Sequence, residues 1–404
     1  MKYKTILIIF CLVIFSLFFL YFPKSHLKLK GEDTPEVQNL QKLADQDDVQ
    51  ALLELAKRYK DSLEYAFGLF SYDTDPYYEK ILELYERAAR QGNAEAQHEV
   101  AMIYYNGLGV ERDYRKGIEW DEKAAKQNYL IAKLVLASVY SENNAGPDNP
   151  ITDPQKAFYW YQQASLQGSS SADFSVGMSY YNGNGITVDY QKALAYLNKS
   201  ADAGNIQALT ALGNFYENCN TGFCDNNKAK YFYEKAANNE ESIAQYNLGR
   251  FYEHGLTGEQ NYTKAMYWYQ KAEERGNGLG ALAVAQLYQE GKGVPQDYLE
   301  AKKHYEIATI YGEPNGYYQI GLLYKNGLGV GKDIVKANHN FQKALEYYEA
   351  FSKYKDDTDA QYMLGILYMN GDGVEKNMVT AKKWFKKAAN NGHIQAKNIL
   401  FSLS

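Results

Sequence analysis

Small and apolar residues recur along most of the chain with a period of about 36 residues. In each copy a tyrosine stands eight positions after one small residue and three positions after another, as Tyr368 follows Ala360 and Gly365. Chance does not keep three positions in phase over so many copies, so the pattern predicts a solenoid of one repeated unit. We count the first small residue as position 0, which makes the tyrosine position 8. The tyrosines at position 8 are Tyr104, Tyr140, Tyr180, Tyr216, Tyr252, Tyr288, Tyr324 and Tyr368.

Each copy is predicted to form two helices. In the first, apolar residues fall at positions 0, 4, 7 and 8, which share one face of a helix with 3.6 residues per turn. The last full copy shows this as Ala360, Leu364, Leu367 and Tyr368. A degenerate copy containing Tyr59 precedes the series and a half-copy follows it. The chain therefore holds about nine units.

Three copies carry extra residues: nine in the first copy, around residues 67–76, four in the copy at Ala132, around residues 143–150, and eight after the second helix of the copy at Gly316, at Tyr347 through Asp357. Insertions in solenoids are expected to form loops, either at a binding edge or as loose spacers.

A glycine-rich turn separates the two helices, as in Gly371-Asp-Gly373. Glycine is favoured there because a helix that ends in a tight reversal needs a positive φ. The second helix carries apolar residues at i, i+3 and i+7, as in Ala265, Trp268 and Ala272. We expect the aromatic residue in the middle to fill the gap to the next unit. The residues at this position are Trp120, Trp160, Tyr196, Phe232, Trp268 and Trp384.

The pattern resembles the Sel-1-like repeat, a relative of the tetratricopeptide repeat. The clearest copy runs over residues 360–374, 381–389 and Gly392, and the resemblance covers residues 49–404. It implies an all-α fold, a superhelical solenoid of helix-turn-helix repeats. It also implies that the protein acts as an interaction scaffold, since this fold carries binding surfaces for differing partners.

The N-terminus differs from the repeats. Residues 5–22 carry no charge and follow Lys2 and Lys4. Eighteen helical residues span about 27 Å, close to the hydrocarbon thickness of a bilayer. We predict an uncleaved signal anchor or transmembrane segment over residues 1–30, a linker over 31–48 and the repeat body over 49–404. A cleaved signal peptide is the alternative. The short basic tail favours export of the body, to the bacterial periplasm or, alternatively, to the outside or the ER lumen.

Charge and motifs exclude several function classes. The chain has 43 basic and 49 acidic residues, a net charge of −6, without the basic stripe that nucleic-acid binding needs. Its six histidines are scattered and form no HExxH motif. Gly278-Leu-Gly280 imitates a dinucleotide fingerprint but follows a predicted helix rather than a strand. We therefore predict no enzyme activity, no metal and no cofactor.

Cys219 stands where the first turn glycine of its copy would be, and Cys224 lies in the same loop. Four intervening residues can close a disulfide in a turn, and in an oxidising compartment this bond would restore the rigidity that the missing glycines supply elsewhere. Two unpaired thiols in a cytosolic loop are the alternative.

Positions 2, 6 and 9 of the first helix lie opposite its core face, on the side that lines the concave groove of a stacked solenoid. Aromatic residues and methionine are enriched there, which is typical of interfaces. The alternative is that these side chains pack on the neighbouring unit. The candidate binding residues are Phe174, Met178, Tyr181, Tyr246, Arg250, Tyr318 and Tyr362.

The function predicted from these observations is a membrane-tethered scaffold of the cell envelope that binds a protein or peptide in its concave groove. Two alternatives come from relatives of the repeat. Cysteine-rich bacterial relatives imply a weak β-lactamase or penicillin-binding activity, although they carry a cysteine pair in every repeat. The eukaryotic namesake implies a lumenal adaptor in protein quality control, with the sequons at Asn198 and Asn261 as its only support.

Overall fold

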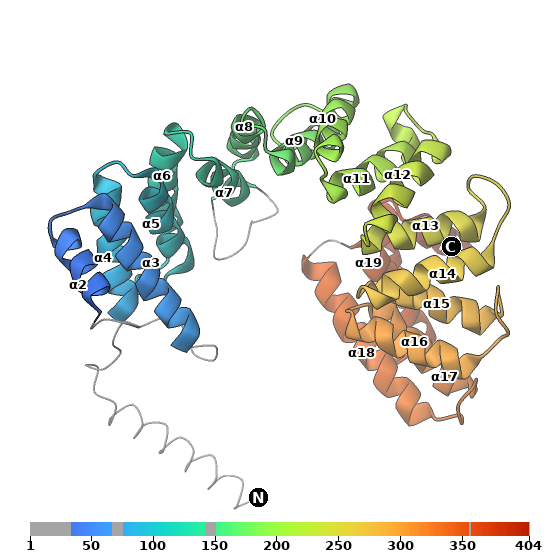
Figure 1. Ribbon diagram of the computed structural model, residues 1–404. Helices are drawn as coiled ribbons and strands as arrows, with labels where there is room; N and C mark the ends of the chain where they lie inside the picture. The colour runs from blue at the N-terminus through green and yellow to red at the C-terminus, as the bar shows by residue number, and fades with distance from the viewer. Residues whose placement is uncertain (1–33, 67–75, 142–150, 355–356, 404) are drawn as a thin grey trace, which may run out of the picture. The chain divides into compact units, whose positions relative to one another are not determined.

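The computed structural model describes residues 34–66, 76–141, 151–354 and 357–403 (Figure 1). Within these ranges every regular element is a helix, which confirms the predicted all-α class. The chain divides into two compact units, residues 1–189 and 190–404, and each is described by itself.

Unit 1 contains eight described helices, and each packs against the next. They are α2 (Pro35–Asp45), α3 (Val49–Ala66), α4 (Pro76–Arg90), α5 (Ala94–Asn106), α6 (Tyr114–Lys126), α7 (Leu130–Tyr140), α8 (Pro154–Ser165) and α9 (Ser170–Asn182).

Unit 2 continues the same alternation from α10 to α21, with a short 3₁₀ helix, η2 (Cys219–Thr221), after α11. Its α-helices are α10 (Tyr190–Asp202), α11 (Ile206–Glu217), α12 (Asn226–Asn238), α13 (Ser242–His254), α14 (Tyr262–Glu274), α15 (Gly278–Glu290), α16 (Tyr298–Ile310), α17 (Pro314–Asn326), α18 (Ile334–Tyr354), α19 (Thr358–Asn370), α20 (Met378–Asn390) and α21 (Ile394–Ser402). From α3 onward, odd-numbered helices are the first helices of their repeats and even-numbered helices are the second.

The glycine turn of the last full repeat is built as the sequence predicts. Gly371 ends α19 with a φ of 76° and its N–H donates to the carbonyl oxygen of Leu367. Asn377 caps α20 with its side chain, which accepts from the N–H of Thr380. The N–H of Asn377 also donates to the carbonyl oxygen of Tyr368, 2.9 Å away, so the cap of the second helix is tied to the end of the first.

The position 8 tyrosines are half-buried or buried, and in five repeats a lysine from the first turn of the second helix lies over the ring. A lysine at this distance from an aromatic face is attracted by the ring quadrupole. This contact gives the recurring tyrosine a role in holding the two helices together. The pairs are Lys116 with Tyr104, Lys156 with Tyr140, Lys228 with Tyr216, Lys264 with Tyr252 and Lys336 with Tyr324.

In most copies the core aromatic of the second helix is not the residue that the sequence pattern predicts, although Trp160 is buried. Trp384 is only partly buried, whereas Phe385, one residue later, is fully buried. The Phe385 ring packs against Gly365, where an added Cβ would lie 2.5 Å from the ring. Side chains of adjacent helical residues point 100° apart, so only one of Trp384 and Phe385 can point at the small residue at position 5. Phe385 is the one that does. The same position, which we call position 25, is fully buried in Tyr85, Tyr233, Tyr269, Tyr305, Phe341 and Phe385.

Two segments differ from the predicted organisation. Residues 31–48 were expected to be a linker, but helix α2 lies there and buries Val37 and Ala44. Thr34 caps it and Pro35 starts it, which are helix-initiation signals. In the other segment, the eight-residue insertion in the copy that begins at Gly316 is helical, because α18 has 21 residues where α20 has 13. Eight residues are close to two helical turns, so the insertion extends the helix and buries Tyr348.

The predicted membrane segment, residues 1–30, lies outside the described residues, as does the loop inserted at residues 143–150. Among the helices that the structure describes, none is both long enough and apolar enough to cross a bilayer.

Candidate functional site

The seven predicted groove residues all lie on first helices and all are half-buried. Phe174, Met178 and Tyr181 belong to α9 of unit 1. The other four belong to α13, α17 and α19 of unit 2. Three of the seven therefore belong to unit 1 and four to unit 2.

The position 2 tyrosines of unit 2 pack on the position 25 ring of their own repeat. Tyr246 lies 5.6 Å from the centroid of Tyr269, Tyr318 5.6 Å from Phe341, and Tyr362 5.9 Å from Phe385. Each tyrosine therefore has one face on the core and presents only part of its surface. Burial first, and then the Asp372 carboxylate, raises the pKa of Tyr318 to about 12.

Arg250 is tied into a polar network rather than standing free. Its guanidinium donates to Glu217 on α11 at 3.0 Å and to Asn247 at 3.3 Å. Glu217 also accepts from the hydroxyl of Tyr233 at 2.8 Å. Burial lowers the pKa of Arg250, but the Glu217 carboxylate outweighs that effect and holds the pKa above its ordinary value. The network links α11, α12 and α13.

One recurring interaction was not recognised in the sequence. In three consecutive repeats of unit 2, the tyrosine at position 25 donates its hydroxyl hydrogen bond to an acidic or amide side chain at position 9. The pairs are Tyr233 with Glu217 (2.8 Å), Tyr269 with Glu253 (2.5 Å) and Tyr305 with Gln289 (3.1 Å). The partners are always 16 residues apart, and that spacing is the signal that could have revealed them.

The first repeat lacks this acceptor. After the nine extra residues of this copy, Tyr85 is the equivalent of position 25, but position 9 is Lys60, which can only donate. Among the residues that the structure describes, no hydrogen bond is formed by the Tyr85 hydroxyl. Burial, followed by the negative charges of Glu99, Glu95 and Asp61, raises the pKa of the Tyr85 phenol.

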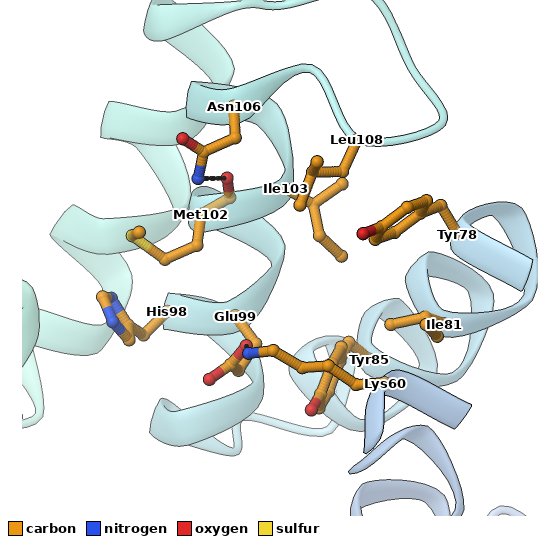
Figure 2. Close-up of a pocket in the computed structure, with 10 residues that line it drawn as sticks. All are labelled: Lys60, Tyr78, Ile81, Tyr85, His98, Glu99, Met102, Ile103, Asn106 and Leu108. Atoms are coloured by element: carbon orange, nitrogen blue, oxygen red, sulfur yellow. Dashed lines mark hydrogen bonds and ion pairs between the residues drawn. The ribbon is translucent and has the colours of Figure 1, made fainter. Parts of the chain in front are cut away.

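A cavity of about 300 Å³ lies at this point of unit 1, between α3, α4 and α5 (Figure 2). In Figure 2 the aromatic and aliphatic side chains of α4 reach in from one side and those of α5 from the other. His98, Met102 and Lys60 hold positions 2, 6 and 9 of their copies, so the cavity lies on the face that the sequence predicted for binding. The lining residues are Lys60, Tyr78, Ile81, Tyr85, His98, Glu99, Met102, Ile103, Asn106 and Leu108.

Ion pairs join α3 to α5 at the edge of the cavity. Lys60 lies 3.2 Å from Glu99, and one turn away Lys57 lies 2.8 Å from Glu95. The side chains are partly exposed, so these pairs contribute little to stability. Their effect is that the charge of each of these lysines is balanced by a carboxylate.

The second repeat of unit 1 exchanges the two residue types of the recurring pair. Here position 9 is Tyr105 and position 25 is Asp121. Asp121 is fully buried and its Oδ1 lies 2.8 Å from Nδ1 of His98. Its Oδ2 and the Tyr105 hydroxyl are both buried without a hydrogen-bond partner among the described residues. Burial outweighs the opposing effect of His98 and raises the pKa of Asp121.

The Tyr105 ring packs against Gly117 of the second helix. An added Cβ on Gly117 would lie 2.3 Å from the Tyr105 ring. This explains why Gly117 replaces the alanine found at the equivalent point of other second helices, such as Ala265 and Ala381.

Cys219 and Cys224 lie in the turn between α11 and α12, with their Cα atoms 4.5 Å apart and their sulfur atoms joined. Gly222 takes the left-handed conformation inside this turn. Phe223, also in the turn, lies 5.6 Å from Phe215 of α11. The redox state of the pair in its native compartment stays a prediction. Within the described ranges, no group of three or more potential metal ligands is found.

Several known proteins are similar in sequence to part of this chain. The curated relatives include chitin synthase regulatory factor 3 of Schizosaccharomyces pombe, 31% identical over 146 residues, which are 35% of this chain and 14% of that protein. An uncharacterised protein of Neisseria meningitidis serogroup B is 29% identical over 112 residues, 28% of this chain and 22% of that protein. The chain thus spans less than a quarter of the length of these relatives.

A solved Sel1 repeat protein from Oxalobacter formigenes is similar over more of the chain. It is 27% identical, with a TM-score of 0.55, and the match covers 80% of this chain and 91% of that one. The family model for the Sel1 repeat matches nine segments: residues 50–93, 94–129, 145–169, 170–205, 206–240, 242–277, 279–309, 314–348 and 358–393. Repeats of this kind generally serve as scaffolds for protein–protein contacts. With nine repeats over most of its length, the chain belongs to the Sel1 repeat family.

Proposed function

We propose that this protein is a non-catalytic interaction scaffold that binds a protein or peptide along the exposed side of its first helices. The observation that carries the proposal is the cavity of unit 1, which lies at positions 2, 6 and 9 and has a mainly apolar lining with a few polar groups. Ligand-binding pockets in proteins are typically lined by apolar side chains with a few polar groups among them. The half-buried aromatic residues at the same positions of unit 2 extend the same chemistry to a second surface.

The test is partner capture by the full-length chain followed by loss of capture in surface variants. Tyr246→Ala and Tyr362→Ala remove first-helix aromatic groups. Tyr267→Ala, on a second helix, removes a tyrosine that is 53% exposed and serves as the matched control. Truncation of an interface hot spot costs about 2 kcal/mol or more, roughly thirtyfold in affinity. Equal capture by all three variants would show that the partner does not bind the first-helix surface of unit 2.

The proposal includes a location, the cell envelope, with the body exported and residues 1–30 holding it at the membrane. The uncharged stretch 5–22 and the cysteine pair support it. Full-length protein should stay with membranes through high-salt and carbonate washes, because an apolar span is not held by charge. Cys219 and Cys224, taken from the native compartment, should resist a thiol probe until reductant is added. Soluble full-length protein or ready alkylation would contradict the location without touching the scaffold function.

A further inference from the structure

The cavity of unit 1 combines an apolar body with one unused hydrogen-bond donor. In the three repeats of unit 2 that have a tyrosine at position 25, its hydroxyl donates a hydrogen bond to the side chain at position 9. The acceptors are Glu217, Glu253 and Gln289. In the first repeat Lys60 replaces that acceptor and pairs with Glu99 instead. Tyr85 lines the cavity, and its hydroxyl is left without a partner among the described residues, beside the Lys60 side chain (Figure 2). A buried hydroxyl without a partner costs free energy that a bound acceptor would recover.

The charges around the cavity select a neutral acceptor. Glu99 and Glu95 are each matched by a lysine, so the edge carries no excess of positive charge. An incoming carboxylate would find both lysines already paired, and the Asp61 carboxylate would repel it. A main-chain carbonyl oxygen accepts the same hydrogen bond without that repulsion.

The size and lining fix the rest of the occupant. About 300 Å³ is the low end for small-molecule sites. Ile81, Ile103 and Leu108 supply aliphatic surface, and Tyr78 an aromatic edge. This space suits one large apolar side chain with the peptide units beside it.

We propose that the cavity between α3, α4 and α5 binds an extended peptide segment of a partner. One large apolar side chain enters the cavity, and a neutral main-chain carbonyl oxygen accepts a hydrogen bond from Tyr85. This inference rests on the proposed scaffold function and names the chemistry that one of its surfaces recognises.

The test uses the full chain and three small probes in ligand-observed saturation-transfer NMR. N-acetyl-leucine methylamide carries the apolar side chain and neutral carbonyl groups. N-acetyl-leucine has the same side chain with a carboxylate, and N-acetyl-alanine methylamide lacks the large side chain. The neutral leucine probe should bind most tightly. Equal signals from all three probes would overturn the proposal.

Paired variants separate the site from the rest of the solenoid. Tyr85→Phe should weaken binding of the neutral leucine probe about threefold to tenfold, the range of one neutral hydrogen bond. Tyr305→Phe, the same change in unit 2, should leave it unchanged. Leu108→Trp should fill the cavity and abolish binding, while Leu328→Trp, at the equivalent turn position of unit 2, should not. Thermal melts identify any variant that has lost its fold, and Tyr85→Phe conserves the ring should Leu108→Trp unfold.

The results also distinguish this inference from the proposed function. Probe binding that is unaffected by Tyr85→Phe and Leu108→Trp in folded protein refutes the peptide site, even if partner capture still depends on Tyr246 and Tyr362. Conversely, loss of probe binding in both Tyr85→Phe and Leu108→Trp supports the site, even if Tyr246→Ala and Tyr362→Ala still capture the partner normally.

Discussion

The exchanged pair in the second repeat, Tyr105 and Asp121, can be tested by reversing it. The double change Tyr105→Glu with Asp121→Tyr would recreate the arrangement of Glu217 with Tyr233. Each single change should be harmful. Asp121→Tyr adds a ring where Tyr105 already lies against Gly117, and overpacking costs about 1–3 kcal/mol. Tyr105→Glu removes a buried ring and puts a second carboxyl group beside Asp121, at a cost of about 3 kcal/mol or more.

The double variant should lose much less stability than the two single variants together. Contacting residues couple by about 0.5–3 kcal/mol, and here both the overpacking and the paired carboxyl groups disappear at once. We therefore expect a coupling of about 2 kcal/mol in favour of the double variant. Gly117→Ala gives an internal check, because it should be harmful beside Tyr105 and tolerated in the double variant.

The measurement is urea unfolding followed by circular dichroism, with hydrogen exchange over α5 and α6. The second method is needed because repeat arrays do not always unfold in one step. Additive costs in the two single variants, with no rescue in the double variant, would refute the equivalence of the exchanged pair with its counterparts in unit 2.

Three further predictions concern stability. Gly365→Ala should cost about 1–3 kcal/mol because its Cβ would lie 2.5 Å from Phe385, whereas Gly331→Ala, with nothing within 4 Å, should be nearly neutral; similar melts for the two would contradict the packing. Phe385→Ala should cost about 3–5 kcal/mol and Trp384→Ala clearly less, since only Phe385 is fully buried; the reverse order in urea unfolding would restore the tryptophan as the core residue. Burial raises the pKa of Asp121, so the folded protein binds the Asp121 proton more tightly than the unfolded chain does. The stability of the native protein relative to Asp121→Asn should therefore fall as the pH rises above about 3.8, the ordinary pKa of the group. A relative gain in stability with rising pH would mean that an ionised pair with His98 dominates.

The sequence predicts which helix positions the candidate site occupies, but not which residues line it. Positions 2, 6 and 9 follow from helical periodicity alone, and the cavity of unit 1 lies there. The pattern does not distinguish the residues that form it, such as His98 and Met102, because the aromatic enrichment at these positions lies in other copies. Tyr85 could not be recognised as a donor without an acceptor until its counterparts in unit 2 were seen to have one.

The sequence by itself determined the repeat, the two helices of each unit and their boundaries, because these depend on local signals. Apolar periodicity defines a helix face, and a glycine with positive φ or a capping Asp or Asn acts within a few residues. The position of Gly371 and of the cap Asn377 required no knowledge of any other helix.

Only the tertiary structure decided which side chains meet between helices. Trp384 and Phe385 both fit an inward-facing stripe, and the approach of Gly365 selects the second. The insertion near Tyr348 reads as a loop until the neighbouring helices offer it a surface to bury. Positions 9 and 25 form a pair because two helices bring residues 16 apart into contact, and neither helix alone contains that contact.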